Sequence, residues 1–114
     1  MKYAIVITYS FHPAWLQKTW QEREDYTRIH VEPIFASYAG KVSVRLFDAE
    51  AFSTRYSDFM LLETEDLKDY YYMIETLRES QLFKDNLVEF KEVILGIEDG
   101  FRNYERDVLN HPNP

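Results

Sequence analysis

The chain has 114 residues, 46% hydrophobic and 17% aromatic, enough to form the core of one small domain. Its formal net charge of -7 opposes binding to phosphate backbones and anionic lipids, so we expect neither nucleic acid nor a membrane as a partner. Because the chain contains no cysteine, disulfides, thiolate catalysis and cysteine-ligated metal centres are excluded. We predict a single domain over residues 1–114, with a flexible tail at 110–114.

The first segment, residues 3–11, is predicted to be a strand with both faces buried. Its odd positions carry large apolar side chains, and its even positions, such as Ala4 and Thr8, carry small ones. Polar residues and then His12-Pro13 interrupt the apolar run too early for a signal peptide. We therefore expect a cytoplasmic protein.

Helical spacing continues over residues 14–30, which predicts one long helix after the first strand. Pro33 disfavours helix before it and suits the first turn of a short second helix that ends at Tyr38. Gly40 is expected to cap that unit.

The second half of the chain predicts two strands, a helix and a last strand. The strands cover residues 42–47 and 56–64, and Thr64 is the expected N-cap of the helix. The apolar stripe of that helix comprises Leu67, Tyr70, Tyr71, Ile74 and Leu77. Residues 87–97 read as a strand that is apolar on both faces, and a short terminal helix follows it.

The order strand, helix, strand, strand, helix, strand predicts an α+β, ferredoxin-like βαββαβ fold with a four-stranded antiparallel sheet. Two helices connected in this way cover only one face of the sheet. Because three of the strands are apolar on both faces, something else must cover the second face. We predict a homodimer that packs sheet to sheet into a dimeric α/β barrel.

Three stretches carry a resemblance to a known family: His30-Val-Glu-Pro-Ile34, residues 44–53 (VRLFDAEAFS), and residues 66–71 (DLKDYY) before Leu77-Arg78. The chain resembles the darcynin family, within the dimeric α/β-barrel superfamily of ferredoxin-like dimers. That superfamily includes antibiotic-biosynthesis monooxygenases, muconolactone isomerases and haem-handling enzymes. The resemblance implies the fold and the dimer, but it brings no catalytic residues to this chain.

The first helix carries polar residues on its apolar stripe. Spacing from Leu16 leads to a stripe that should face the sheet: Trp20, Arg23, Tyr26 or Thr27, and His30. Arg23 has two interpretations. Either it lies at the edge of the stripe, in water or paired with Asp48 or Asp58, or it is a cation aimed into a cavity that receives a carboxylate, phenolate or enolate.

The histidines also allow two interpretations each. His30 can stabilise the negative end of the helix, or it can serve as a general base or as a metal or haem ligand. His12 is either an exposed loop residue or a base close to Tyr9 on the first strand. There is no histidine pair at one-turn spacing and no cofactor motif, so we expect no metal site and no cofactor.

The leading hypothesis is a homodimer whose cavity binds a small aromatic or anionic metabolite through Tyr9, Arg23, Trp20 and Tyr26. Whether it is an enzyme stays open. By analogy with the superfamily, the reaction would be cofactor-independent oxygenation or isomerisation, with His12 or His30 as the base and Arg23 and Tyr9 stabilising an enolate. The alternatives are a non-catalytic dimeric binding or regulatory module, and a haem protein with one of these histidines as axial ligand.

Overall fold

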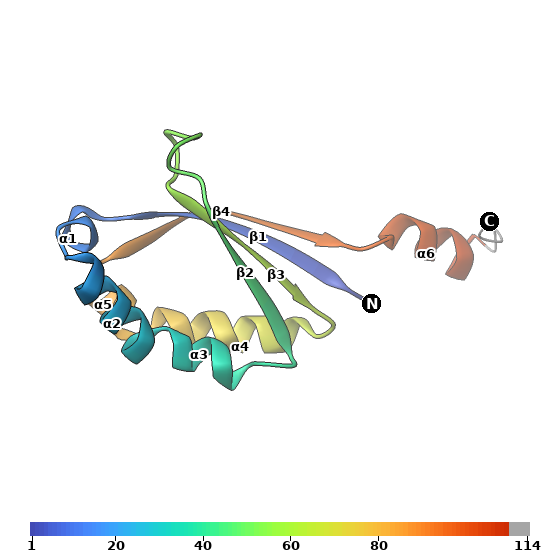
Figure 1. Cartoon of the computed structure of the whole chain (residues 1–114). Helices are drawn as coiled ribbons and strands as arrows, with labels where there is room; N and C mark the ends of the chain where they lie inside the picture. The colour runs from blue at the N-terminus through green and yellow to red at the C-terminus, as the bar shows by residue number, and fades with distance from the viewer. Residues whose placement is uncertain (110–114) are drawn as a thin grey trace.

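Four antiparallel strands form one sheet in the computed structural model, which describes residues 1–109 (Figure 1). They are β1 (Tyr3–Phe11), β2 (Val42–Asp48), β3 (Asp58–Thr64) and β4 (Val88–Ile97), in the spatial order β2-β3-β1-β4. The helices are α1 (Pro13–Leu16), α2 (Trp20–His30), α3 (Glu32–Ser37), α4 (Leu67–Arg78), α5 (Gln81–Lys84) and α6 (Gly100–Asp107). This arrangement confirms the predicted α+β, ferredoxin-like fold. The tail expected at 110–114 lies outside the described residues.

The core lies between the helices and one face of the sheet. Ile5 and Ile7 of β1 are fully buried, and they pair with Leu62 and Met60 of β3 across the antiparallel register. Because paired residues share a face, these side chains form one apolar layer. Met73 of α4 closes this layer from the helix side.

Within residues 1–109, no helix covers the second face of the sheet, since α2, α3 and α4 lie along the opposite face (Figure 1). Apolar side chains nevertheless project from it. Phe47 of β2 stacks on Phe59 of β3 with ring centroids 4.8 Å apart, and Ile94 of β4 is exposed. The expectation that both faces of the sheet are apolar is therefore confirmed. We call this surface the open face and define it by Phe47, Phe59, Leu61 and Ile94.

The prediction of one helix over 14–30 is wrong, because the chain forms α1, a turn at 17–19, and then α2. The turn ends in a capping box: Thr19 accepts a hydrogen bond from the Glu22 amide, and the Glu22 carboxylate accepts one from the Thr19 amide. Because α2 begins at Trp20 and does not continue α1, the side chains of residues 14–30 do not form one continuous apolar stripe. Trp20, expected to face the sheet, is 68% exposed.

Two smaller expectations around α4 are also corrected. The N-cap is Asp66, whose carboxylate accepts a hydrogen bond from the Lys68 amide, whereas the Thr64 hydroxyl donates to the Lys41 carbonyl. Tyr71 is exposed, and Met73 is the fully buried residue instead. Of the rest of the predicted stripe, Leu77 lies in the core and Tyr70 and Ile74 pack against it, while Leu67 is half-buried. Among residues 1–109, no helix combines the length and the apolar composition that a membrane crossing requires.

Candidate functional site

An apolar cavity of about 130 Å³ lies between the helices and the sheet. Strand β1 supplies Tyr9 and Phe11, which point to the helix side because they share the face of Ile5 and Ile7. Helix α1 supplies Trp15, which stacks on Phe11 with ring centroids 5.0 Å apart. The other lining residues are nearly all apolar: Thr27, Val31, Phe35, Leu46, Met60, Leu77, Leu82, Val88 and Phe90.

A second, polar hollow of about 400 Å³ adjoins this cavity and shares the walls Phe11 and Trp15 with it. Its remaining lining residues are mostly charged or polar: Leu16, Arg23, Asp48, Glu50, Ser57 and Asp58. We call this hollow the carboxylate mouth. The two spaces together offer an apolar interior beside a polar entrance, which is the usual composition of a small-molecule site.

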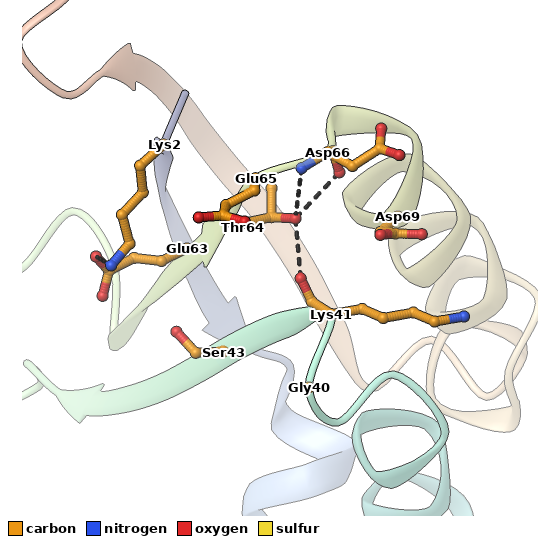
Figure 2. Close-up of a pocket in the computed structure, with 9 residues that line it drawn as sticks. All are labelled: Lys2, Gly40, Lys41, Ser43, Glu63, Thr64, Glu65, Asp66 and Asp69. Carbon is orange, nitrogen blue, oxygen red and sulfur yellow. Dashed lines mark hydrogen bonds and ion pairs between the residues drawn. The ribbon is translucent and has the colours of Figure 1, made fainter.

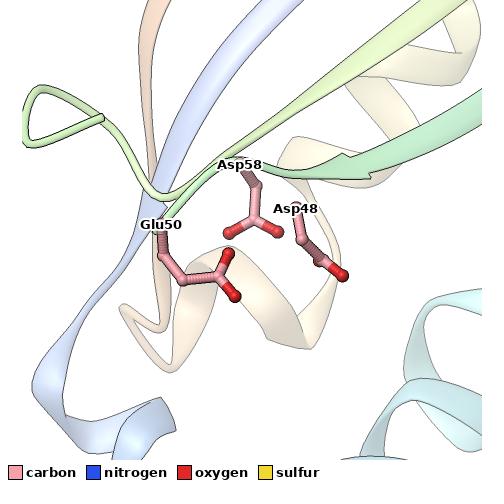
Figure 3. A group of neighbouring side chains, drawn as sticks. All are labelled: Asp48, Glu50 and Asp58. Atoms are coloured by element: carbon pink, nitrogen blue, oxygen red, sulfur yellow. The ribbon is translucent and has the colours of Figure 1, made fainter. Parts of the chain in front are cut away.

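Three carboxylates gather in the mouth (Figure 3), and their oxygens lie within 4.8 Å of one another. Asp48 ends β2 and Asp58 begins β3, and the two residues are register partners, so their side chains share a face. Glu50 follows on the loop between these strands. Asp58 is only 8% exposed, while Asp48 and Glu50 are exposed.

Burial changes the acidity of Asp58 and Tyr9, which pair across β1 and β3. Burial, a hydrogen bond shared with Asp48, and the charges of Asp48 and Glu50 raise the pKa of Asp58 to about 6, although the Ser57 hydroxyl opposes this. Burial and then the negative charges of Asp58 and Asp48 raise the pKa of Tyr9 above its ordinary value. The Tyr9 hydroxyl therefore stays protonated and can donate a hydrogen bond, and the Asp58 carboxyl titrates near pH 6.

The three carboxylates are also the groups that could hold a metal ion. Oxygen donors alone suit a hard cation such as calcium or magnesium. Arg23 lines the same mouth and would compete for these carboxylates. Neither His12 nor His30 lines the apolar cavity or the mouth, so neither of these histidines could be the axial ligand of a haem in these spaces.

The structure brings only two of the predicted site residues to these spaces: Tyr9 lines the apolar cavity and Arg23 lines the mouth. Tyr26 packs edge-on against Trp15 and donates a 2.8 Å hydrogen bond from its hydroxyl to Asp85. Burial, and then this bond, raise the pKa of Tyr26, so its hydroxyl stays a donor.

His12 and His30 contact different residues. The His30 ring lies 4.6 Å from the ring of Tyr26. His12 approaches the Glu89 carboxylate at 3.3 Å, in a different depression that Arg78 and Asn86 also line. Trp20 lines none of these spaces.

The carboxylate trio as a unit was missed by the sequence reasoning, which considered Asp48 and Asp58 only as partners for Arg23. A signal was available. Asp48 lies two residues after Leu46, and Asp58 lies two residues before Met60, so alternation places both acids on the core-facing side of adjacent strands. Alternation does not predict the strand register that places Asp48 and Asp58 opposite each other.

A second acid-rich hollow, of about 490 Å³, lies at the other end of β3 (Figure 2). Several of its polar groups bond to one another or to the backbone. The Thr64 hydroxyl contacts the Lys41 carbonyl and the backbone of Asp66, and Lys2 lies 3.5 Å from Glu63. Asp66 caps α4. These residues hold the ends of elements together, so we do not assign them to the candidate site.

Solved structures with similar backbones are chlorite dismutases. The chlorite dismutase of Candidatus Nitrospira defluvii in complex with imidazole matches with a TM-score of 0.73 and 13% identity, covering 85% of this chain and 40% of that one. The chlorite-dismutase-like protein TA0507 matches with a TM-score of 0.73 and 17% identity, covering 88% of this chain and 47% of that one. The chain thus spans less than half of these proteins, and the likeness shows the fold alone.

Curated relatives are closer in sequence. Darcynin of Chromobacterium violaceum is 47% identical over 75 residues, which is 66% of this chain and 94% of that protein. Darcynin 1 of Acinetobacter baumannii is 42% identical over 85 residues, which is 75% of this chain and 93% of that protein. The family profile described as "Darcynin, domain of unknown function" matches residues 3–112. The chain therefore belongs to the darcynin family.

Proposed function

We propose that this chain binds a small molecule with a single aromatic ring in the apolar cavity, and that the polar substituent of the ligand lies in the carboxylate mouth. The observation that carries this proposal is the cavity of about 130 Å³. An apolar cavity of about 150 Å³ inside a protein accepts benzene. Tyr9, Phe11, Trp15 and Phe90 offer ring faces and edges that suit an aromatic ligand.

The mouth favours one kind of polar substituent. Asp48, Glu50 and Asp58 accept hydrogen bonds or attract a cation, while Arg23 is the one basic residue among its lining residues. The hydroxyl of a phenol or the amino group of an aromatic amine can therefore interact favourably with more of the charged groups in the mouth than the carboxylate of an aromatic acid can. Of the aromatic and the anionic ligands expected from the sequence, the geometry supports the aromatic one.

Thermal shift and titration calorimetry with phenol, tyramine and benzoate test this proposal, since all three carry one six-membered ring. We expect tyramine and phenol to bind, and benzoate to bind at least ten-fold more weakly. Thr27→Met fills the cavity from α2 and should weaken tyramine binding at least ten-fold, whereas Thr54→Met, on an exposed loop position, should not. Equal binding by both variants, or no binding of any probe, would contradict the proposal.

A second candidate is isomerisation by proton transfer, favoured by the buried Asp58 beside Tyr9. The Asp58 carboxylate takes a proton from a carbon next to a carbonyl group, and the enolate oxygen accepts a hydrogen bond from Tyr9. In a β,γ-unsaturated ketone, Asp58 then returns the proton to the γ carbon, while the C=C bond moves between the α and β carbons and the carbonyl group re-forms, so no cofactor is consumed. His12 and His30, the bases expected from the sequence, line neither space.

Deuterium exchange separates this enzyme from a non-catalytic binding module. An aromatic ketone such as phenylacetone, incubated with the protein in D2O, should gain deuterium next to its carbonyl group, with a rate that rises through about pH 6 as Asp58 ionises. Asp58→Asn should lower that rate at least 100-fold and leave binding of the ketone intact. If deuterium exchange is no faster than in buffer although the ketone binds, the isomerase is contradicted and the non-catalytic binding module is supported.

We also propose a homodimer that buries the open face, because its apolar centre has an ionic rim. Arg45 and Lys2 each lie 3.5 Å from Glu63, and Arg55 lies 2.9 Å from Glu92. An apolar centre with a polar rim is the usual composition of a protein interface. The cytoplasmic location expected from the sequence stays a prediction, which cell fractionation would check.

Native mass spectrometry tests the dimer. Ile94→Glu puts a charge at the centre of the open face and should convert the dimer to monomer. Leu16→Glu changes an exposed apolar residue of α1 and should leave the dimer intact. A monomeric parent protein at micromolar concentration would contradict the proposal.

A further inference from the structure

Helix α6 stands away from the rest of the described chain. Figure 1 shows it beyond the edge of the sheet, at the end of β4 and apart from α1–α5. The radius of gyration is 17.1 Å, and the longest extent is 57 Å against a shortest of 19 Å. A compact domain of this length would have a radius of gyration near 13 Å. We call residues 93–109, which include the end of β4 and α6, the arm.

The arm carries two apolar surfaces. On β4, Val93, Leu95 and Ile97 are each about half exposed, although they share the helix-facing side of the sheet with Ile7, Ile5 and Tyr3. We call these three residues the β4 row. On α6, the apolar residues lie on one stripe at helical spacing: Phe101, Tyr104 and Val108. Phe101 is 71% exposed.

An isolated helix of this length is not stable in water, so α6 needs a surface against which to bury its stripe. The β4 row and the stripe, together with Leu109, expose on the order of 700 Å² of side-chain surface. That area is close to the roughly 800 Å² that each partner contributes to a stable interface. The arm is therefore large enough to form an interface with a second copy.

The two surfaces of the arm do not cover each other, because α6 begins three residues after the β4 row ends and continues outward from the sheet (Figure 1). A second copy related by a two-fold axis supplies the missing partner for both surfaces at once. We propose that the arm is a reciprocal clasp: the α6 stripe of each copy packs on the β4 row of the other. The clasp requires the proposed homodimer, but it is a contact separate from the open face.

Engineered cysteines test the clasp cleanly, because the natural chain has none. Two differently tagged chains, one with Leu95→Cys and one with Tyr104→Cys, are co-expressed and treated with a short bismaleimide. We expect a covalent dimer that carries both tags. Pairing Leu95→Cys with Phe52→Cys, a 92% exposed loop position, should give no such product. Equal yields from the two pairs, or no product from the first, would overturn the clasp.

A dilution series by analytical ultracentrifugation separates the clasp from the open face. The double variant Phe101→Lys/Tyr104→Lys changes only exposed side chains of α6, and it should raise the dimer dissociation constant at least ten-fold. Arg102→Ala, also exposed on α6, should leave it unchanged. An unchanged constant in the double variant overturns the clasp and leaves the open-face dimer standing. A parent protein that is monomeric at every concentration overturns both.

Discussion

The two ends of β3 both collect carboxylates, but they use them differently. At the start of the strand, Asp58 is buried in the carboxylate mouth beside an apolar cavity, and its pKa is raised to about 6 (Figure 3). At the other end, Glu63 pairs with Lys2 and Arg45, and Asp66 caps α4 (Figure 2). The number of acids is similar, so number does not distinguish the two hollows.

The distinguishing feature is what surrounds each carboxylate. Asp58 is buried, and the charged groups near it include Asp48 and Glu50, so ionisation of Asp58 is opposed. At the other end, the ammonium of Lys2 and the guanidinium of Arg45 pair with Glu63, and a backbone amide donates to Asp66, contacts that are typical of structural roles. A carboxylate becomes a candidate for chemistry when its environment leaves the charge uncompensated.

The largest effect is expected from removing the wall that the cavity and the mouth share. Trp15→Ala should lower the free energy of unfolding by about 3–5 kcal/mol, because a large buried side chain leaves a void. Trp20→Ala, an exposed position, should change it by less than about 0.5 kcal/mol. Urea unfolding followed by circular dichroism measures both. Similar losses in the two variants would mean that the aromatic wall does not stabilise this end of β3.

The pH dependence of stability tests the environment of Asp58. Because its pKa is raised from 3.8 to about 6 in the folded state, the stabilisation from its bound proton is present below about pH 4 and lost as pH rises through 6. Asp58→Asn should match the parent near pH 4 and exceed its unfolding free energy by about 1–3 kcal/mol at pH 7, because each unit of pKa shift corresponds to at most about 1.4 kcal/mol and solvent screening lowers that figure. Urea midpoints across this range measure the difference. Parallel curves for the two proteins would contradict the buried, uncompensated charge.

Asp66 tests the structural role of the opposite end. Asp66→Ala removes the oxygen that accepts from the Lys68 amide, and it should lower the unfolding free energy by about 1 kcal/mol. Asp66→Asn keeps a capping oxygen and should restore most of that loss. The same urea experiment measures both variants. No loss in the alanine variant would show that this carboxylate is not needed as a cap.

The smallest effect concerns the ion pair of Lys2 and Glu63. Lys2→Ala should lower the unfolding free energy by no more than about 0.5 kcal/mol, and 1 M salt should remove the difference, since exposed pairs are weak and screened. Unfolding curves at low and high salt measure this. A larger, salt-resistant loss would mean that this end of β3 depends on the pair more than its exposure indicates.

Local sequence patterns predicted much of the fold. Alternation in residues 3–11 predicted β1 and the apolar side chains on both of its faces, and the pattern over 87–97 predicted β4 within one residue. The helix over 14–30 was predicted wrongly because the apolar spacing continues across the turn, while the capping box of Thr19 and Glu22 that begins α2 was overlooked. Of the site residues, Tyr9 and Arg23 were predicted and lie at the two spaces.

The order of the elements and their periods, and hence the βαββαβ fold, follow from the amino-acid sequence, because side-chain alternation and helical spacing are properties of neighbouring residues. Long-range packing places Asp48 and Asp58 opposite each other beside an apolar cavity, and it leaves α6 away from the rest of the domain. Strand register and the burial of a charge depend on residues far apart in the chain, and a single sequence does not specify those distances.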